Sequence, residues 1–244
     1  MTGNPTLTQK TFTEVGRVTP GEAMTVQGTV NKTAVLLLLT TISAAYTWQL
    51  FWKGDSASAG LWITGGAIGG FIVALITIFK KEWSGVTAPV YAVFEGLFIG
   101  GISSLFEQRF PGIVIQAVML TFGTLAALLA AYTMGLIRAS SGFRRGIFAA
   151  TGGIALLYLV SMVLGFFHIQ IPLIFGAGPV GILFSVAVVI IAALNLVIDF
   201  DFIESGAQQG APKYLEWYGA FGLMVTLIWL YMEILRLLSK LNRR

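Results

Sequence analysis

The sequence predicts an all-α membrane protein with seven transmembrane helices, and three observations support this fold class. Hydrophobic residues make up 56% of the 244-residue chain and charged residues only 11%, whereas a soluble domain carries about 25% charged residues. The mean hydropathy is +0.83. Because this much apolar side chain does not fit inside one globular core, we expect a lipid bilayer to surround the protein.

Seven apolar runs of about 20–25 residues are the third observation. A helix rises about 1.5 Å per residue, so about 20 residues cross a hydrocarbon layer of roughly 30 Å. Lipid offers no partner to a backbone N–H, and the alternation of a β-barrel is absent, so each run is expected to be helical. The runs cover residues 33–52, 59–79, 87–106, 113–137, 146–167, 179–200 and 217–238.

These runs predict three parts: a polar N-terminal tail (1–32), a seven-helix domain (33–240) and a short basic C-terminal tail (241–244). Lys and Arg favour the inner side of a membrane. With a cytoplasmic N-terminus, the inner segments hold more of them than the outer loops, although the basic C-terminal tail then lies outside. The inner residues are Lys10, Arg17, Lys32, Lys80, Lys81, Arg138, Arg144, Arg145 and Lys213, and the outer loops hold Lys53 and Arg109. We therefore predict a cytoplasmic N-terminus. Because the basic residues lie in loops and tails beside the spans, where they set topology, we expect no nucleic-acid partner.

Small residues recur inside several of the predicted helices. Such spacing favours close packing of helices on one another, and a second interpretation is that these helices slide or bend. The glycines concerned are Gly65, Gly66, Gly69, Gly70, Gly96 and Gly100, and the stretch "ATGGIA" in the fifth run is similar.

Four acids are candidates for an ion or proton site, because a charged side chain at bilayer depth is energetically costly and is often functional. Asp199 and Asp201 end the sixth run, Glu95 lies within the third, and Glu233 lies within the seventh. Asn195 precedes Asp199 by four residues and shares its helix face, whereas Asp201 is about 200° away and is expected to meet water. Asn195, Glu95 and Asp201 are therefore possible pore-lining residues beside an ion or proton site.

Each acid also has a simpler interpretation. Asp199 is then a helix-end residue that meets water, Glu95 is a protonated or hydrogen-bonded packing residue, and Glu233 is neutralised by Arg236 three residues later. If Asp199 and Glu233 meet instead, two carboxylates in an apolar site do not easily both ionise, and they share a proton. Calcium, which takes oxygen ligands in irregular geometry, is the cation we expect to replace that proton.

Several other classes of function lack their signatures. The chain has no cysteine, and no phosphate loop, dinucleotide fingerprint or HExxH zinc motif appears, so we expect no enzymatic activity and no cofactor. An intramembrane aspartyl protease, which uses two acids on late helices, needs "YD" and "GxGD" motifs that are absent. A retinal-type receptor needs a lysine inside the seventh helix, and Lys240 is expected beyond its end.

Four motifs occur in a fixed order along the chain: "MTVQGTVNKTAVLLLL" (24–39), "TAPVYAVFEGLFIGGISSLFE" (87–107), the "ID" of "NLVIDFDFIE" (195–204) and "LYMEILRLL" (230–238). Together they resemble the Bax inhibitor-1 family, also called the transmembrane Bax inhibitor motif family, in its bacterial branch. The resemblance covers roughly residues 20–240. It implies an integral protein of the bacterial cytoplasmic membrane.

The resemblance also implies a central last helix surrounded by the other six, and a pH-sensitive calcium leak. Its acid pair corresponds to Asp199 and Glu233, which would then be the calcium ligands. Two features depart from the family: the seventh-helix acid is Glu instead of the usual Asp, and the segment between the acids is longer. Either the pair is looser than in relatives or the sixth helix continues to about residue 206. A regulatory or scaffold protein that binds other membrane proteins without transport remains the alternative.

Overall fold

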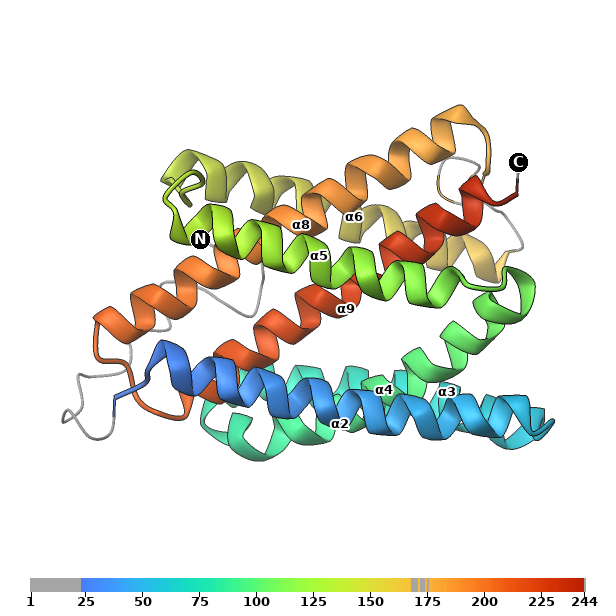
Figure 1. Ribbon diagram of the computed structural model, residues 1–244, viewed down its shortest axis with the longest axis horizontal. Coiled ribbons are helices and arrows are strands. Elements are labelled where there is room, and N and C mark those ends of the chain that lie inside the picture. The colour runs from blue at the N-terminus through green and yellow to red at the C-terminus, as the bar shows by residue number, and fades with distance from the viewer. Residues whose placement is uncertain (1–22, 168–170, 172–173, 175, 244) are drawn as a thin grey trace. The chain divides into compact units, whose positions relative to one another are not determined.

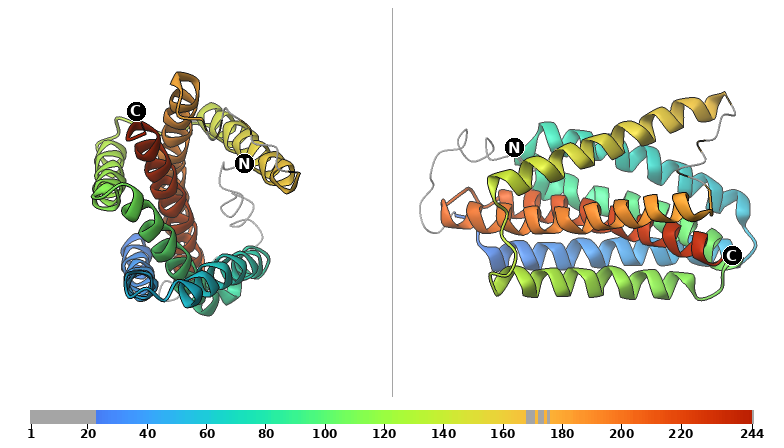
Figure 2. Two further views of the ribbon diagram at one scale, coloured as in Figure 1. Left: turned by 90° about the vertical axis from the view of Figure 1, so that its right-hand side faces the viewer. Right: turned by 90° about the horizontal axis from the view of Figure 1, so that it is seen from above.

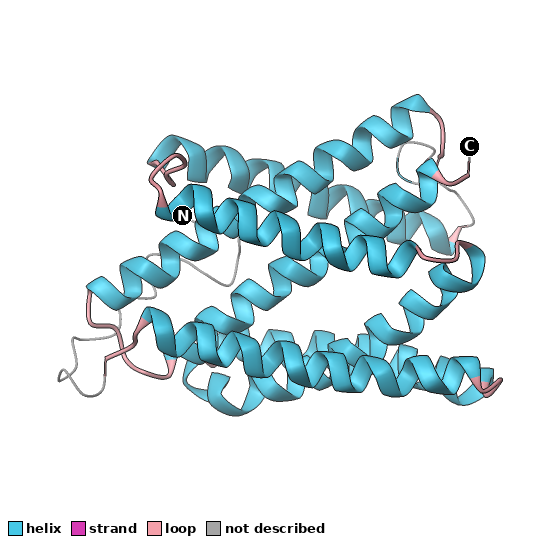
Figure 3. Ribbon diagram, in the orientation of Figure 1, coloured by secondary structure: helices cyan, strands magenta, loops and turns pink. Residues whose placement is uncertain are grey.

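The computed structural model describes residues 23–167, 171, 174 and 176–243 (Figures 1 and 3). Within these residues the chain forms helices and turns, and Ala23 and Pro212 form one isolated bridge. Seven described helices are long and apolar enough to cross a membrane, which confirms the all-α, seven-span fold class. The helices are α2 (Val26–Trp52), α3 (Ser56–Phe79), the short η1 (Lys81–Trp83), α4 (Ser84–Arg109), α5 (Ile113–Thr133), α6 (Ser141–Phe166), α8 (Pro179–Gln208) and α9 (Leu215–Leu241).

Local signals set two helix ends that differ from the apolar runs. The first helix begins at Val26 instead of residue 33, because the Thr25 hydroxyl accepts a hydrogen bond from the Gly28 N–H at 2.9 Å and caps it. The predicted polar tail is therefore partly helical, and its residues 1–22 lie outside the described residues. The fourth spanning helix, α5, ends at Thr133, although its apolar run continues to residue 137. It ends there because Gly135 turns the chain with a left-handed φ of 72°.

The two helices that carry the acid pair are both longer than their apolar runs. The sixth span, α8, continues through both aspartates to Gln208, as the longer alternative predicted, and the left-handed Gly210 follows it. The seventh span, α9, extends to Leu241. A helix continues wherever its backbone hydrogen bonds continue, so charged residues mark the end of an apolar run without ending the helix.

The described chain falls into two compact units. Among the described residues, unit 1 contains those of Gly112–Asp201 and of 225–243, and unit 2 contains 23–111 and Phe202–Met224. Helices α8 and α9 each contribute one part to each unit. The acids Asp199 and Glu233 belong to unit 1, and Glu95 belongs to unit 2.

In unit 2, α4 packs along both α2 and α3 (Figure 2), and glycines allow the close approach. A Cβ added to Gly96 would collide with Thr40 of α2, and one added to Gly66 would lie 2.6 Å from the Phe94 carbonyl oxygen. Gly65, in contrast, has no neighbouring atom within 4 Å of such a Cβ. The predicted close packing is therefore confirmed at Gly66 and Gly96, and it does not occur at Gly65. Sliding or bending of the helices stays a prediction.

In unit 1, polar contacts join α6 to α8 and α9, and ring contact joins α5 to α8. The ring centroids of Tyr132 and Phe200 lie 5.8 Å apart. Helix α9 is the most buried of the seven: 61% of its most apolar 18-residue stretch is buried, against 11% of that of α6. The central position of the last helix among the other six stays a prediction.

Candidate functional site

Asn195 and Asp199 form a buried polar face on α8. They lie one helical turn apart, and the exposed fractions of the two residues are 2% and 0%. Because α8 continues to Gln208, Asp199 lies in the interior of the helix. The interpretation of Asp199 as a helix-end residue that meets water is therefore wrong.

Hydrogen bonds orient the Asn195 side chain. Its Nδ2 donates to Thr151 Oγ1 of α6 at 2.9 Å and to the Ile191 carbonyl at 2.8 Å, so both amide hydrogens are in use. Its Oδ1 is buried and accepts no hydrogen bond from the described residues. Since Nδ2 is turned toward Ile191, one turn before Asn195, Oδ1 lies on the other side of the amide and offers an oxygen ligand.

Glu233 is both buried and paired. It is 1% exposed, and its Oε1 accepts hydrogen bonds from the Tyr158 hydroxyl and from Arg236 Nη1, each at 2.8 Å. The same Nη1 lies 3.0 Å from Oε2 and donates to the Tyr158 oxygen at 2.6 Å. The predicted local pairing with Arg236 is therefore confirmed, and it occurs inside the fold, where the carboxylate is shielded from solvent.

Asp201 is not the water-facing residue that the helix period suggested. Its Oδ2 accepts a hydrogen bond from Arg144 Nη2 of α6 at 2.6 Å, and its side chain is only 20% exposed. Arg144 also donates to the Ala139 carbonyl, which holds the guanidinium at the start of α6. The correction has a simple cause, because a neighbouring helix brings a cation that the sequence of α8 alone does not reveal. A pore-lining role for Asp201 stays a prediction.

Lys240 also differs from its predicted position. It lies in the last turn of α9, is 2% exposed, and donates to the Gly181 carbonyl at 2.9 Å and to Ser185 Oγ at 2.8 Å. It does not lie beyond the seventh helix. The ammonium group instead joins the end of α9 to the first turns of α8.

Glu95 lies within α4 in unit 2. Its side chain is partly exposed, and its Oε2 lies 3.0 Å from the place that a Cβ on Gly70 would occupy. Its participation with Asp199 and Glu233 in one cavity stays a prediction.

Several polar residues that sequence reasoning missed complete these contacts. Thr151 and Tyr158 of α6 hold Asn195 and Glu233, and isolated hydroxyls inside an apolar run were the available signal. In unit 2, the buried Glu216 of α9 forms an ion pair with Lys32 of α2 and accepts hydrogen bonds from the Thr25 N–H and hydroxyl at 2.9 and 3.0 Å. Because Glu216 belongs to a polar segment between two apolar runs, the sequence did not single it out.

The described residues contain no group of three or more His, Cys, Asp or Glu side chains that could hold a metal ion. A calcium ion bound by Asp199 and Glu233 would therefore take further ligands from neutral oxygens. Asn195 Oδ1 has the required chemistry. Calcium binding by Asp199 and Glu233 stays a prediction.

Together, seven apolar helices and buried acids within them define an integral membrane protein with a polar site inside its spans. The family described as "Bax inhibitor 1 like" matches residues 4–243, which is nearly the whole chain. The chain therefore belongs to this family, as its motifs predicted. No curated protein and no solved structure matches it.

Proposed function

We propose that the protein lets a cation, calcium, cross the membrane, and that Asp199 and Glu233 bind this cation in competition with protons. The family assignment supports a membrane protein of this kind. The observation that carries the proposal is the near-complete burial of both carboxyl groups, at 0% and 1% exposure, within apolar helices of one unit. Because a charged group at bilayer depth is costly, two buried acids favour an ion or proton pathway over a purely structural role.

The neutral side-chain oxygen of Asn195, one helical turn from Asp199, suits the same ion. Calcium takes six to eight oxygen ligands in flexible geometry. Asn195 Nδ2 donates to Thr151 and Ile191, and Oδ1, on the other side of the amide, is available as a carbonyl-type ligand. The calcium ion is the transported species in this proposal, and no catalysed reaction is assigned to the site.

Arg236 is a built-in competitor for the same carboxylate. Its Nη1 contacts both oxygens of Glu233, at 2.8 and 3.0 Å, and its side chain is 30% exposed. A long side chain with such exposure can move toward solvent when a divalent cation takes its place. In this proposal, protons and the guanidinium both oppose calcium, so flux should fall as the medium becomes more acidic.

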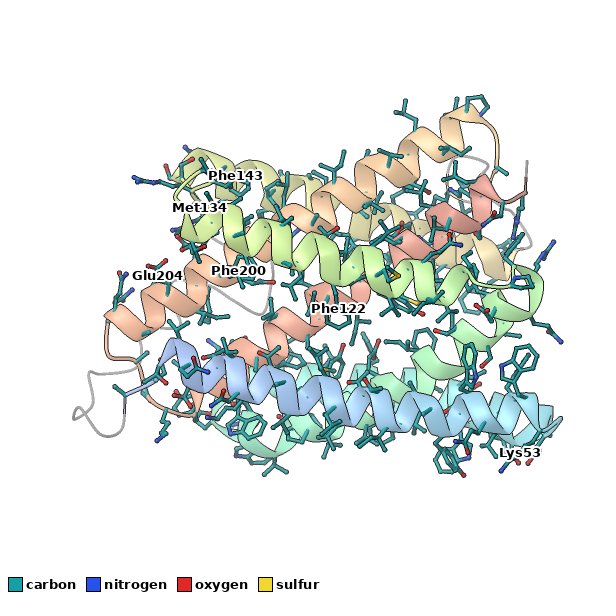
Figure 4. All side chains as sticks on the ribbon, in the orientation of Figure 1. Lys53, Phe122, Met134, Phe143, Phe200 and Glu204 are labelled. Carbon is teal, nitrogen blue, oxygen red and sulfur yellow. The ribbon has the colours of Figure 1, made fainter. Side chains whose placement is uncertain are left out.

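The proposal is tested with purified protein in liposomes that contain a calcium-sensitive dye. We expect calcium flux from the unaltered protein, a strong reduction in Asp199→Asn and Glu233→Gln, and loss of the pH dependence in the double variant. Glu204→Gln is the matched control, because Glu204 lies on α8 one turn beyond Phe200 and is exposed (Figure 4). Unaltered flux and pH response in the double variant would disprove the proposal.

A second outcome also opposes the proposal. If the unaltered protein passes no calcium at any pH, while its far-ultraviolet spectrum shows the helices intact, the regulatory or scaffold alternative is favoured. The proposed cytoplasmic N-terminus rests on the positions of Lys and Arg in the loops, and the proposed bacterial membrane rests on the resemblance of the motifs.

A further inference from the structure

Glu95 is an acid at the middle of a membrane-spanning helix. Helix α4 runs from Ser84 to Arg109, so Glu95 is separated from the two ends by about 16 and 21 Å at about 1.5 Å per residue. No apolar-run boundary lies near it. The side chain therefore lies at a depth where an ionised carboxyl group is costly.

The contact between α3 and α4 leaves room for this carboxyl group. A Cβ on Gly70 would lie 3.0 Å from Glu95 Oε2, and one on Gly69 would lie 2.7 Å from the Phe94 ring. Glycine at position 70 thus leaves the carboxyl oxygen its space. Unlike Glu216 and Glu233, which are 1% exposed, Glu95 remains partly exposed at the surface of the described structure.

Charged partners do not balance Glu95 among the described residues. Glu216, Glu233 and Asp201 each form an ion pair with a lysine or arginine, and Glu95 forms none of the ion pairs found. Helix α3, against which it packs, carries no charged residue between Ser56 and Phe79.

The other titratable groups on the elements that pack against α4 form no ion pair with Glu95 among the pairs found in the described residues. On α2, Lys32 pairs with Glu216 of α9, and η1 contributes Lys81, which lies over the Tyr218 ring, and Glu82. On α4 itself, Tyr91 precedes Glu95 by one turn and packs against Phe221. The remaining tyrosine of α2, Tyr46, packs against Trp62 of α3. Among these described groups, none supplies Glu95 with a cation.

A proton is the ligand that suits such a group. One carboxyl group offers two oxygens, and no described group of three or more metal-binding side chains includes it. A bound proton removes the charge that lipid disfavours, by the simple equilibrium in which a carboxylate and a proton form the neutral acid. We infer that Glu95 binds a proton inside the membrane and is a second titratable site, in unit 2, distinct from the acids Asp199 and Glu233 of unit 1.

Hydrophobic carbodiimide labelling tests this inference on the full chain in lipid nanodiscs. Dicyclohexylcarbodiimide enters lipid and adds to a protonated carboxyl group; the acid's proton passes to a reagent nitrogen, and the product rearranges to a stable acylurea. Peptide mapping by mass spectrometry should find one added reagent on Glu95 near neutral pH. Labelling should fall about tenfold for each pH unit once the medium is alkaline enough to ionise the group.

Controls separate this result from general carboxyl reactivity and from the proposed function. Glu95→Gln should lose the labelled peptide, and a water-soluble carbodiimide should modify the exposed Glu204 while leaving Glu95 unmodified. Labelling in Asp199→Asn should equal that in the unaltered chain, because the inference concerns a group of unit 2 and needs no calcium flux. Absence of the adduct on Glu95 in the folded protein, or equal modification of Glu95 and Glu204 by the water-soluble reagent, would overturn the inference.

Discussion

Removing the ammonium group of Lys32 should destabilise unit 2, because Glu216 then loses its cation while it stays buried. The side chains of Lys32 and Glu216 are 19% and 1% exposed. Removing one partner of a buried ion pair costs about 3–5 kcal/mol, and the partial exposure of Lys32 favours the lower end of this range. Two hydrogen bonds from Thr25 to Glu216 Oε1 remain. We therefore expect Lys32→Met to lower the free energy of unfolding by about 3 kcal/mol.

A second substitution should recover at least half of this loss. In Lys32→Met with Glu216→Gln, the buried group is neutral, and the glutamine oxygen can still accept the hydrogen bonds from Thr25. We expect the double variant to lie within about 1.5 kcal/mol of the unaltered protein. Glu216→Gln alone should cost about 1 kcal/mol, because the partly exposed Lys32 can reach water. The two substitutions are therefore expected to be non-additive by at least about 2.5 kcal/mol.

The measurement is equilibrium unfolding in mixed micelles of a mild detergent and sodium dodecyl sulfate, followed by tryptophan fluorescence. Lys32 Nζ lies 5.5 Å from the centroid of the Trp217 ring, so this probe lies beside the altered pair. Lys53→Met is the control, because Lys53 is exposed in the turn after α2 (Figure 4) and should change stability by less than about 0.5 kcal/mol. A loss below about 1 kcal/mol for Lys32→Met, or full additivity, would refute the reasoning.

Three further changes are predicted. Gly96→Ala should cost about 1–3 kcal/mol, because its Cβ meets the backbone of α2, whereas Gly65→Ala, with open space around its Cβ, should cost nothing in the same unfolding assay. Thr151→Val should lower the free energy of unfolding by about 1–3 kcal/mol and weaken calcium flux, because the Asn195 amide loses a hydrogen-bond acceptor. Thr151→Ser keeps a hydroxyl and should restore both the stability and the flux. Equal defects in the two variants would contradict this. Lys240→Met should stay within about 1 kcal/mol in thermal unfolding, since it removes a costly buried charge together with its hydrogen bonds.

The fold class was predictable from the sequence because lipid leaves the backbone few choices. An apolar run of about 20 residues must satisfy its own N–H and C=O groups and therefore forms a helix. Family membership was predictable from motifs in a fixed order, and the match to residues 4–243 confirms it. Helix ends were less predictable: the Thr25 cap and the extension of α8 to Gln208 depend on hydrogen bonds that hydropathy does not measure.

The candidate site was predictable only in part. The local pairing of Glu233 with Arg236 followed from a spacing of three residues on one helix, and the structure contains it. The partners supplied by α6 did not follow, because Thr151, Tyr158 and Arg144 are far from their acceptors and donors along the chain.

The sequence by itself determined the solvent, the number of spanning helices, the family and the positions of Glu95, Asp199 and Glu233 inside the spans, since composition and helix period are local properties. The tertiary structure alone decided which acids receive a cation from another helix. Asp201 has Arg144 from α6, and Glu216 has Lys32 from α2, 184 residues away along the chain. It also decided which glycines meet a neighbouring helix: Gly96 does and Gly65 does not. The physical reason is that pairing and close packing depend on the distance between side chains of different helices, which short stretches of sequence do not encode.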